Sequence, residues 1–135
     1  IAAATRNPAG LVYRSWKDGR GAMIWFWKNP DTGRYGLKEL PLDDGTSAYW
    51  APLDEAERPA HIGERGTVVV LLGRDPSDDT TLPPDGARDD GAHALWLTRY
   101  LNTRFFEFPE GVEVRARERW GTPASRVRPV RGMSH

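Results

Sequence analysis

The sequence predicts an α+β protein, a two-layer sandwich in which helices cover one face of an antiparallel or mixed sheet. Three observations lead to this fold class. Residues 11–16 and 22–27 are aromatic and β-branched, as paired strands are, and residues 67–72 form an unbroken apolar run. Apolar residues recur with helical spacing over residues 92–106. A chain of 135 residues is long enough for one such domain and short for two.

Composition excludes several classes of function. Lys+Arg and Asp+Glu are both 19, so the zero formal charge gives no general reason to expect nucleic acid or an anionic membrane as a partner. The chain has no cysteine, which excludes disulfides and thiolate chemistry. No apolar run approaches the roughly 20 residues that span a bilayer, and residues 1–4 lack the basic flank of a signal peptide. We therefore expect no membrane partner and a cytoplasmic location.

The first strands form a meander. Residues 1–6 read as the last turns of a helix whose beginning is missing, so we expect the chain to be a piece of a longer protein. Residues 11–16 and 22–27 pair as a hairpin because residues 18–21, Asp-Gly-Arg-Gly, are typical of a tight turn. A third strand follows at residues 35–40. These segments predict three antiparallel strands in sequence order.

The second half of the chain is less regular. Residues 41–64 are rich in Asp, Pro and Ala without a clear period, which predicts a long functional loop. Because residues 67–72 are apolar at nearly every position, we expect a strand with both faces covered, in the centre of the sheet. Residues 74–91 are acidic and predicted to be mobile. A helix at residues 92–106 and a strand at residues 112–117 complete the prediction.

The strand at residues 22–27 has two apolar faces, with Trp25 and Trp27 on one of them. Helices cover only one face of a two-layer sandwich, so the tryptophan face needs another cover. Trp50, within the long loop, is the side chain that we expect to fold back over both rings. If the two rings are exposed instead, an interface with a partner is the alternative.

The order of elements and one short motif resemble the second half of the ATP-binding domain of the GHKL superfamily. This is the group of DNA gyrase, the ninety-kilodalton heat-shock chaperone, histidine kinases and MutL. The segment ERGTVVVLLGRD is similar to the family's glycine-containing loop and buried strand, and WLTRYLNTRFFEFPEGVEVRARE to its closing helix and strand. The resemblance covers residues 1–118 and implies a partial GHKL-type ATPase domain. Residues 119–135 are then a basic Pro/Gly-containing linker or tail.

The resemblance implies that Gly66 and Thr67 bind ATP. In the family, the threonine of this motif lies beneath the adenine, where its hydroxyl shares a hydrogen-bonded network with a carboxylate and a water. A threonine hydroxyl both donates and accepts, so it can hold such a water, and a glycine lets the backbone approach a ligand closely. The residues alone leave a structural alternative open, in which Gly66 forms a turn and Thr67 begins a strand.

The family's catalytic parts have no match in this chain. Its magnesium-binding Asn, its general-base Glu, its DxGxG aspartate and its glycine boxes all lie upstream of the matched region. We therefore identify no catalytic and no metal-ligating residue. The resemblance implies ATP with Mg²⁺ in the intact protein, with ATPase activity there, and neither hydrolysis nor tight ATP binding by this chain alone. It also allows a homodimer partner or a following transducer domain.

A binding module without ATP chemistry is the alternative function. The chain has 6 tryptophans, and Arg117, Arg119, Arg126 and Arg128 form a basic stripe near its end. Aromatic strands beside basic residues can stack nucleobases or sugars, so nucleic acid or carbohydrate stays open as a ligand. Core packing also accounts for the tryptophans, and a solvated linker accounts for the arginines.

Overall fold

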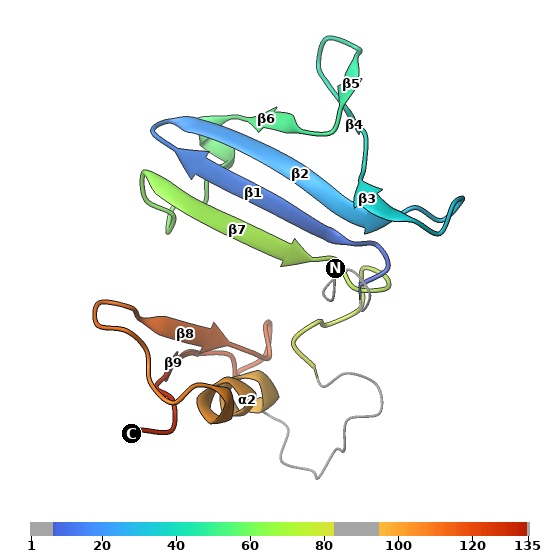
Figure 1. Ribbon diagram of the computed structural model, residues 1–135. Coiled ribbons are helices and arrows are strands. Elements are labelled where there is room, and N and C mark those ends of the chain that lie inside the picture. The colour runs from blue at the N-terminus through green and yellow to red at the C-terminus, as the bar shows by residue number, and fades with distance from the viewer. Residues whose placement is uncertain (1–6, 83–94, 135) are drawn as a thin grey trace. The chain divides into compact units, whose positions relative to one another are not determined.

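The computed structural model describes residues 7–82 and 95–134, and these form two compact units, Ile1–Asp78 and Asp79–His135 (Figure 1). The elements of the larger unit are β1 (Leu11–Lys17), β2 (Arg20–Lys28), β3 (Tyr35–Leu37), β4 (Leu40–Pro41), β5 (Ser47–Ala48), β6 (Ala51–Leu53), the 3-10 helix η1 (Glu55–Glu57) and β7 (Arg65–Leu71). The smaller unit contains α2 (Trp96–Arg104), β8 (Val114–Arg117) and β9 (Val127–Val130).

The predicted α+β sandwich is wrong. Strands make up 35% of the described residues and helices 11%, and the strands form several antiparallel sheets. The one α-helix of the described residues, α2, packs on the β8–β9 hairpin of its own unit, so no helical layer belongs to the main sheet. The main sheet has the order β3-β2-β1-β7, with β6 paired to β2, which leaves β7 at the edge instead of the predicted centre.

The predicted β1–β2 hairpin is confirmed. Asp18 and Gly19 have φ values of 52° and 76°, and two successive positive φ values are what a two-residue type I′ turn requires. Asp and Gly both tolerate this left-handed conformation. The turn sets the register that pairs Lys17 with Arg20 at one end and Leu11 with Phe26 at the other.

Alternation along the strands gives the main sheet two faces. The face that we call the core face carries Val12, Arg14, Trp16, Gly21, Met23, Trp25, Trp27, Gly36, Ala51, Leu53, Gly66, Val68 and Val70. The opposite face, which we call the open face, carries Leu11, Tyr13, Ser15, Lys17, Arg20, Ala22, Ile24, Phe26, Lys28, Tyr35, Leu37, Pro52, Arg65, Thr67, Val69 and Leu71.

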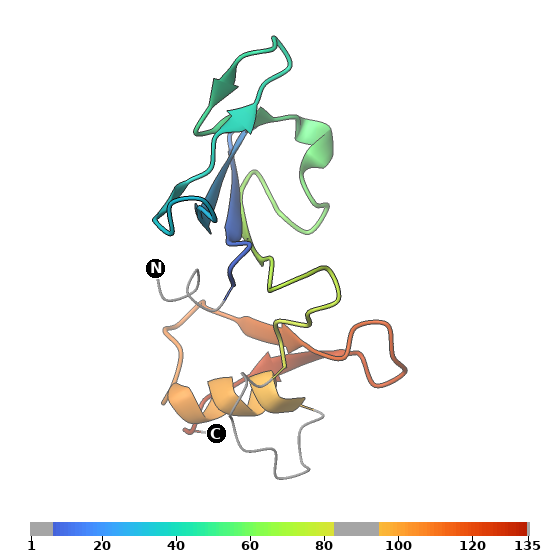
Figure 2. The same ribbon diagram turned by 90° about the vertical axis from the view of Figure 1, so that its right-hand side faces the viewer.

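The core of the larger unit lies under the core face, around Trp16, which is only 2% exposed. Leu53 of β6 is buried with it. The Arg14 guanidinium lies 5.2 Å from the Trp16 ring centroid and forms an ion pair with Glu57 of η1 at 3.5 Å. The segment that contains η1 therefore covers this end of the core face, and Figure 2 shows η1 to one side of the sheet.

Trp50 does not cover the other tryptophans, so that prediction is wrong. Its side chain is 56% exposed and lines a hollow with Ala22 and Pro52 of the open face. Trp25 and Trp27 are half-buried, with the Lys38 ammonium 4.0 Å and 4.7 Å from their ring centroids. A lysine therefore partly covers the two rings, which form neither a buried core nor a fully exposed patch.

The long loop predicted at residues 41–64 contains short elements. The third strand ends at Leu37 rather than at residue 40, and β4 and β5 then form a small separate hairpin. β6 pairs with β2 through Met23 and Ala51, which widens the sheet at the hairpin end. This pairing places β6, and Trp50 directly before it, alongside β2.

In the smaller unit, α2 contacts the β8–β9 hairpin, whose Ala116 and Val130 are buried. The helix is shorter than the predicted 92–106, although residues 92–94, like residues 1–6, lie outside the described residues. β9 lies within residues 119–135, the segment assigned to a tail. Among the described residues, no helix is long and apolar enough to cross a membrane.

Candidate functional site: a hollow on the open face

Cationic side chains form one row across the open face, at the hairpin end of the sheet. Lys17 of β1 pairs in register with Arg20 on one side and with Arg65 on the other. Arg65 forms an ion pair with Asp18 at 3.3 Å. Lys17 and Arg20 have no carboxylate partner within the described part of the chain. This row can therefore attract an anionic group.

Hydroxyl groups and small side chains form the next row. Ser15 pairs in register with Thr67 on β7 and with Ala22 on β2. Ser15 Oγ lies 3.1 Å from Thr67 Oγ1 and 3.3 Å from the Gly66 carbonyl oxygen, to which it donates. Thr67 is exposed, so its hydroxyl is accessible from the open face. Because the Ser15 hydrogen is donated to the Gly66 carbonyl, the Thr67 hydroxyl donates to Ser15 Oγ, and the pair offers its remaining lone pairs to a ligand as acceptors.

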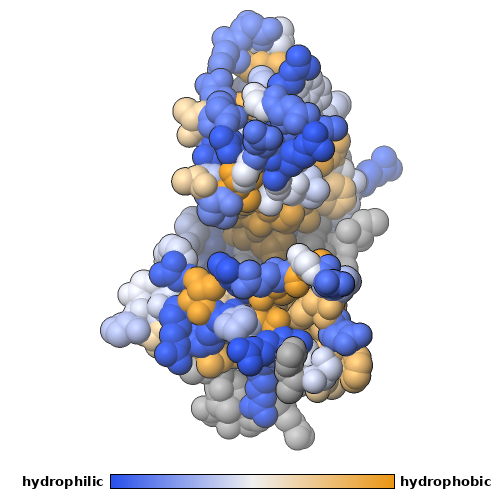
Figure 3. Space-filling model, turned by 90° about the vertical axis from the view of Figure 1, so that its left-hand side faces the viewer, coloured by the Kyte–Doolittle hydropathy of each residue, from blue (hydrophilic) through white to orange (hydrophobic). Residues whose placement is uncertain are grey.

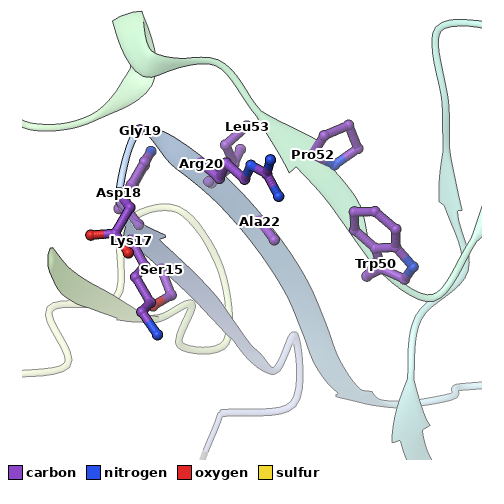
Figure 4. A pocket seen from close by; sticks show the side chains of 11 residues that line it. Ser15, Lys17, Asp18, Gly19, Arg20, Ala22, Trp50, Pro52 and Leu53 are labelled. Carbon is purple, nitrogen blue, oxygen red and sulfur yellow. The ribbon is translucent and has the colours of Figure 1, made fainter. Parts of the chain in front are cut away.

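A hollow of about 860 Å³ lies at the β1, β2 and β6 part of these rows and is not lined by any residue of β7 (Figure 4). Its lining includes the small side chains of Ser15 and Ala22, and Trp50 with its neighbour Pro52 forms an apolar wall. The residues of the β1–β2 turn and the two cations beside it, Lys17 and Arg20, line the other part. Its volume is within the usual range for small-molecule sites, roughly 300–1,000 Å³. It combines a flat aromatic side chain, a hydroxyl and positive charge.

Each residue of the Arg-Gly-Thr segment also has a structural contact. Arg65 pairs with Asp18, and Thr67 is bonded to Ser15. A Cβ built on Gly66 would lie 2.5 Å from Ile62 Cγ2, so the packing of Ile62 on the core face explains this glycine without a ligand. Of the two predicted site residues, the structure places Thr67 on the open face beside the hollow, and it places Gly66 under Ile62.

Sequence reasoning missed most of the residues that line the hollow. Lys17 and Arg20 flank the predicted turn, and writing out the register of that hairpin would have placed them side by side with Ser15 on one face. Trp50 and Pro52 were assigned to a loop. No local pattern indicates that this loop returns to β2 as β6, because the pairing is between residues distant in sequence.

The carboxyl groups whose pKa is lowered lie in exposed turns and strands. A hydrogen bond from Arg74 lowers the pKa of Asp78, and one from the Ser77 hydroxyl lowers the pKa of Asp75. The same kind of hydrogen bond, from Thr46, lowers the pKa of Asp44. These contacts organise local turns. Within the described residues, no group of three or more His, Asp or Glu side chains could hold a metal ion.

No protein-family model, curated protein or solved structure matches the chain. The resemblance to the GHKL superfamily therefore rests on the sequence pattern alone. The hollow and its neighbouring hydroxyl pair are the structural features on which a function can be argued.

Proposed function

We propose that the chain is part of an ATP-binding domain of the GHKL type and that the open face supplies one wall of the nucleotide site. One observation carries the proposal: the Thr67 hydroxyl lies on the open face, 3.1 Å from Ser15 Oγ, and Ser15 lines the hollow. Thr67 is the residue to which the resemblance assigns the adenine contact. The proposal concerns nucleotide binding and makes no claim that the chain folds as an α+β sandwich.

The base of the nucleotide stacks against the wall formed by Trp50 and Pro52. A tryptophan ring offers a large apolar surface to a flat heterocycle, and base–aromatic stacking contributes about 1–3 kcal/mol per base. Ser15 and Thr67 lie across Ala22 from this wall, in the same row of the sheet. Their hydroxyls bind the polar edge of the base directly or through a water.

The phosphates bind at the row of cations. Lys17 and Arg20 supply charge to them, and Arg65 supplies less because it already pairs with Asp18. All of these groups face solvent, and ion pairs in water contribute little, typically about 0–1 kcal/mol each. We therefore expect this chain alone to bind ATP with a Kd on the order of 1 mM.

The proposal assigns no chemical step to this chain. The described residues hold no group of acidic or histidine side chains suited to Mg²⁺, so the metal of an intact site depends on groups other than those described. The residues named above bind and orient a nucleotide. Hydrolysis is therefore a property that we propose only for an intact domain.

An NMR titration of the 135-residue chain tests the proposal. ATP, adenosine and tripolyphosphate are added separately to about 10 mM, several times the expected Kd. We expect ATP to shift the resonances of Ser15, Thr67 and the Trp50 indole. Adenosine should act mainly on the Trp50 indole and the hydroxyl row, and tripolyphosphate mainly on Lys17 and Arg20. Absence of shifts on the open face at the highest ATP concentration would overturn the proposal.

Thr67→Val and Thr67→Ser form the matched pair of variants. Because Thr67 is exposed, water replaces a lost hydrogen bond, and Thr67→Val should weaken ATP binding by only about 0.5–1.5 kcal/mol, roughly 2- to 12-fold. Thr67→Ser keeps the hydroxyl and should bind as the parent does. Equal affinity of both variants would remove Thr67 from the site, and a micromolar Kd for the parent would contradict a partial site.

A second candidate, single-stranded nucleic acid, is favoured by an observation in the smaller unit. Trp120 is 73% exposed, and the Arg117 guanidinium lies 3.9 Å from its ring centroid. Arginines outnumber glutamates in residues 95–134. An exposed ring with cations near it is a typical stacking site for a base. In the same titration, an oligonucleotide that shifts the Trp120 indole and leaves Thr67 unchanged would favour this candidate over the first.

A further inference from the structure

Among the described residues, the outer edge of β7 carries a complete set of unpaired backbone groups. In an antiparallel strand, successive residues direct their N–H and C=O groups alternately toward one neighbour and the other. The Leu72 N–H donates to the Gly10 carbonyl, and the Glu64 carbonyl accepts from the Asp18 N–H. Even-numbered residues of this segment therefore bond toward β1, and the odd-numbered residues direct their groups outward.

Four residues of β7 are odd-numbered: Arg65, Thr67, Val69 and Leu71. Within the described part of the chain, no hydrogen bond pairs their outward N–H and C=O groups. The sequence of β7 itself gives this edge little protection, since the strand contains no proline and only one charged residue, Arg65, at its start. Natural proteins protect a long, apolar edge because it pairs readily with another strand.

The side chains of β7 suit a strand inside a sheet better than one at its edge. Val69 is 50% exposed on the open face, and Val70 and Leu71 are also exposed. A strand with apolar residues on both faces is typical of the interior of a sheet. Figure 3 shows that hydrophobic residues reach the surface beside hydrophilic ones. The sequence of β7 thus fits a strand with a neighbour on each side. Among the described strands, β7 has a neighbour on one side, which is β1.

We propose that β7 pairs with β7 of a second copy of this chain, antiparallel about a two-fold axis at Val68. In this register Arg65 lies opposite Leu71 of the copy, and Thr67 lies opposite Val69. Every outward residue then faces another outward residue, so all four use both of their backbone groups. The four outward pairs form roughly eight hydrogen bonds. The register is symmetric, as an interface between identical subunits requires.

Side chains support the same register. The two Arg65 side chains lie at opposite ends of the β7–β7 interface, each beside its own Asp18. Side chains of like charge therefore do not meet across the interface. Val68 faces Val68 of the copy on the core face, and β-branched residues are favourable cross-strand pairs. The two sheets become one continuous sheet. Since the added strand lies in the plane of the sheet, the open face stays accessible, and this inference does not depend on nucleotide binding.

Sedimentation velocity of the full chain, over a range of concentrations, gives the first test. We expect a concentration-dependent species of twice the 15.2 kDa chain mass. Amide hydrogen exchange by NMR, measured on the same samples, locates the interface without any variant. Protection of Thr67, Val69 and Leu71 should rise with concentration, while the inward amides of Val68 and Val70 stay protected throughout. A chain that is monomeric at all concentrations would overturn the proposal.

Two variants of the same residue test the pairing itself. Val69→Pro removes an outward N–H and no bond to β1, and should weaken dimerisation roughly 10- to 100-fold, because symmetry removes the bond twice. Val69→Lys leaves the backbone unchanged and places a lysine opposite Thr67 of the copy, diagonally across the axis from the second lysine, so it provides the answer if the proline variant does not fold. Val112→Lys, at an exposed valine outside β7, is the matched control and should dimerise normally. Dimerisation that survives both Val69 variants would place the interface elsewhere.

Discussion

The buried carboxylate of Glu118 offers the sharpest test of how the smaller unit is held together. Glu118 is 4% exposed. Its oxygens accept from the backbone N–H of Leu97 at 2.5 Å, from the N–H of Thr98 at 3.1 Å and from the Thr98 hydroxyl at 2.5 Å. The N-cap residue of α2, Leu95, makes no side-chain capping bond. A glutamate distant in sequence therefore caps this helix and joins it to the end of β8.

The expected cost of Glu118→Gln follows from these contacts. The amide keeps the shape of the side chain, but its NH₂ group faces donors where the carboxylate had an acceptor. A hydrogen bond to a charged group contributes about 1.5–3 kcal/mol, and loss of an N-cap costs about 0.5–2 kcal/mol. Because the two effects share the same contacts and do not add, we expect a loss of about 1.5–3 kcal/mol of unfolding free energy.

Urea unfolding of the full chain, followed by the helical circular dichroism signal, measures this loss. Glu113→Gln is the matched control because Glu113 is exposed and its carboxylate pairs with Arg115, two residues away, and such surface pairs contribute little stability. We expect the control to unfold with the parent and Glu118→Gln to unfold at clearly lower urea. If the two variants unfold together, the carboxylate does not hold α2 in place and the reasoning is wrong.

Two further predictions concern the larger unit. A Cβ at Gly21 would lie 2.5 Å from Trp16 Nε1 and 2.9 Å from Leu53 Cβ, so Gly21→Ala should cost about 1–3 kcal/mol of unfolding free energy, measured by the total tryptophan fluorescence in urea; an unchanged midpoint would contradict the packing. The hydrogen bond from Arg74 lowers the pKa of Asp78 in the folded state, so its stabilisation is present above the unfolded-state pKa and fades as the pH falls through the folded value. Asp78→Asn should therefore destabilise more at pH about 7 than at pH about 2; an equal difference at both pH values in chemical unfolding would argue against it.

Local turn chemistry made the β1–β2 hairpin predictable. Asp18 and Gly19 are residues that accept positive φ, and the alternating strands on either side fix the register once the turn is known. Trp16 and its neighbours could be assigned to one face from the same register. What could not be predicted was the cover of that face, because the contact of Arg14 with Glu57 joins residues far apart in the sequence.

The position of β7 in the sheet could not be predicted from its sequence. An apolar run indicates a strand that is suited to burial, but it does not show which strands pair with it. Residues 67–72 are consistent with an interior strand, and no strand of the described residues pairs with their outer edge. β9 was missed for a different reason. Pro129 interrupts its pattern, and a proline is compatible with a strand only where its missing N–H is not needed. β6 was missed for the same reason, because Pro52 lies within that strand and the segment was therefore assigned to the long loop.

The Thr67 variants can separate the structural reading of the Arg-Gly-Thr segment from the functional one. Gly66 is explained by Ile62 and cannot distinguish the two readings, because any substitution there disturbs packing. The Thr67 hydroxyl instead bonds Ser15 at a site exposed to water, where a lost bond is replaced by solvent. Thr67→Val should therefore leave the unfolding free energy within about 0.5 kcal/mol of the parent, while Ser15 keeps its bond to the Gly66 carbonyl. With stability unchanged, any loss of ATP binding belongs to the hydroxyl itself.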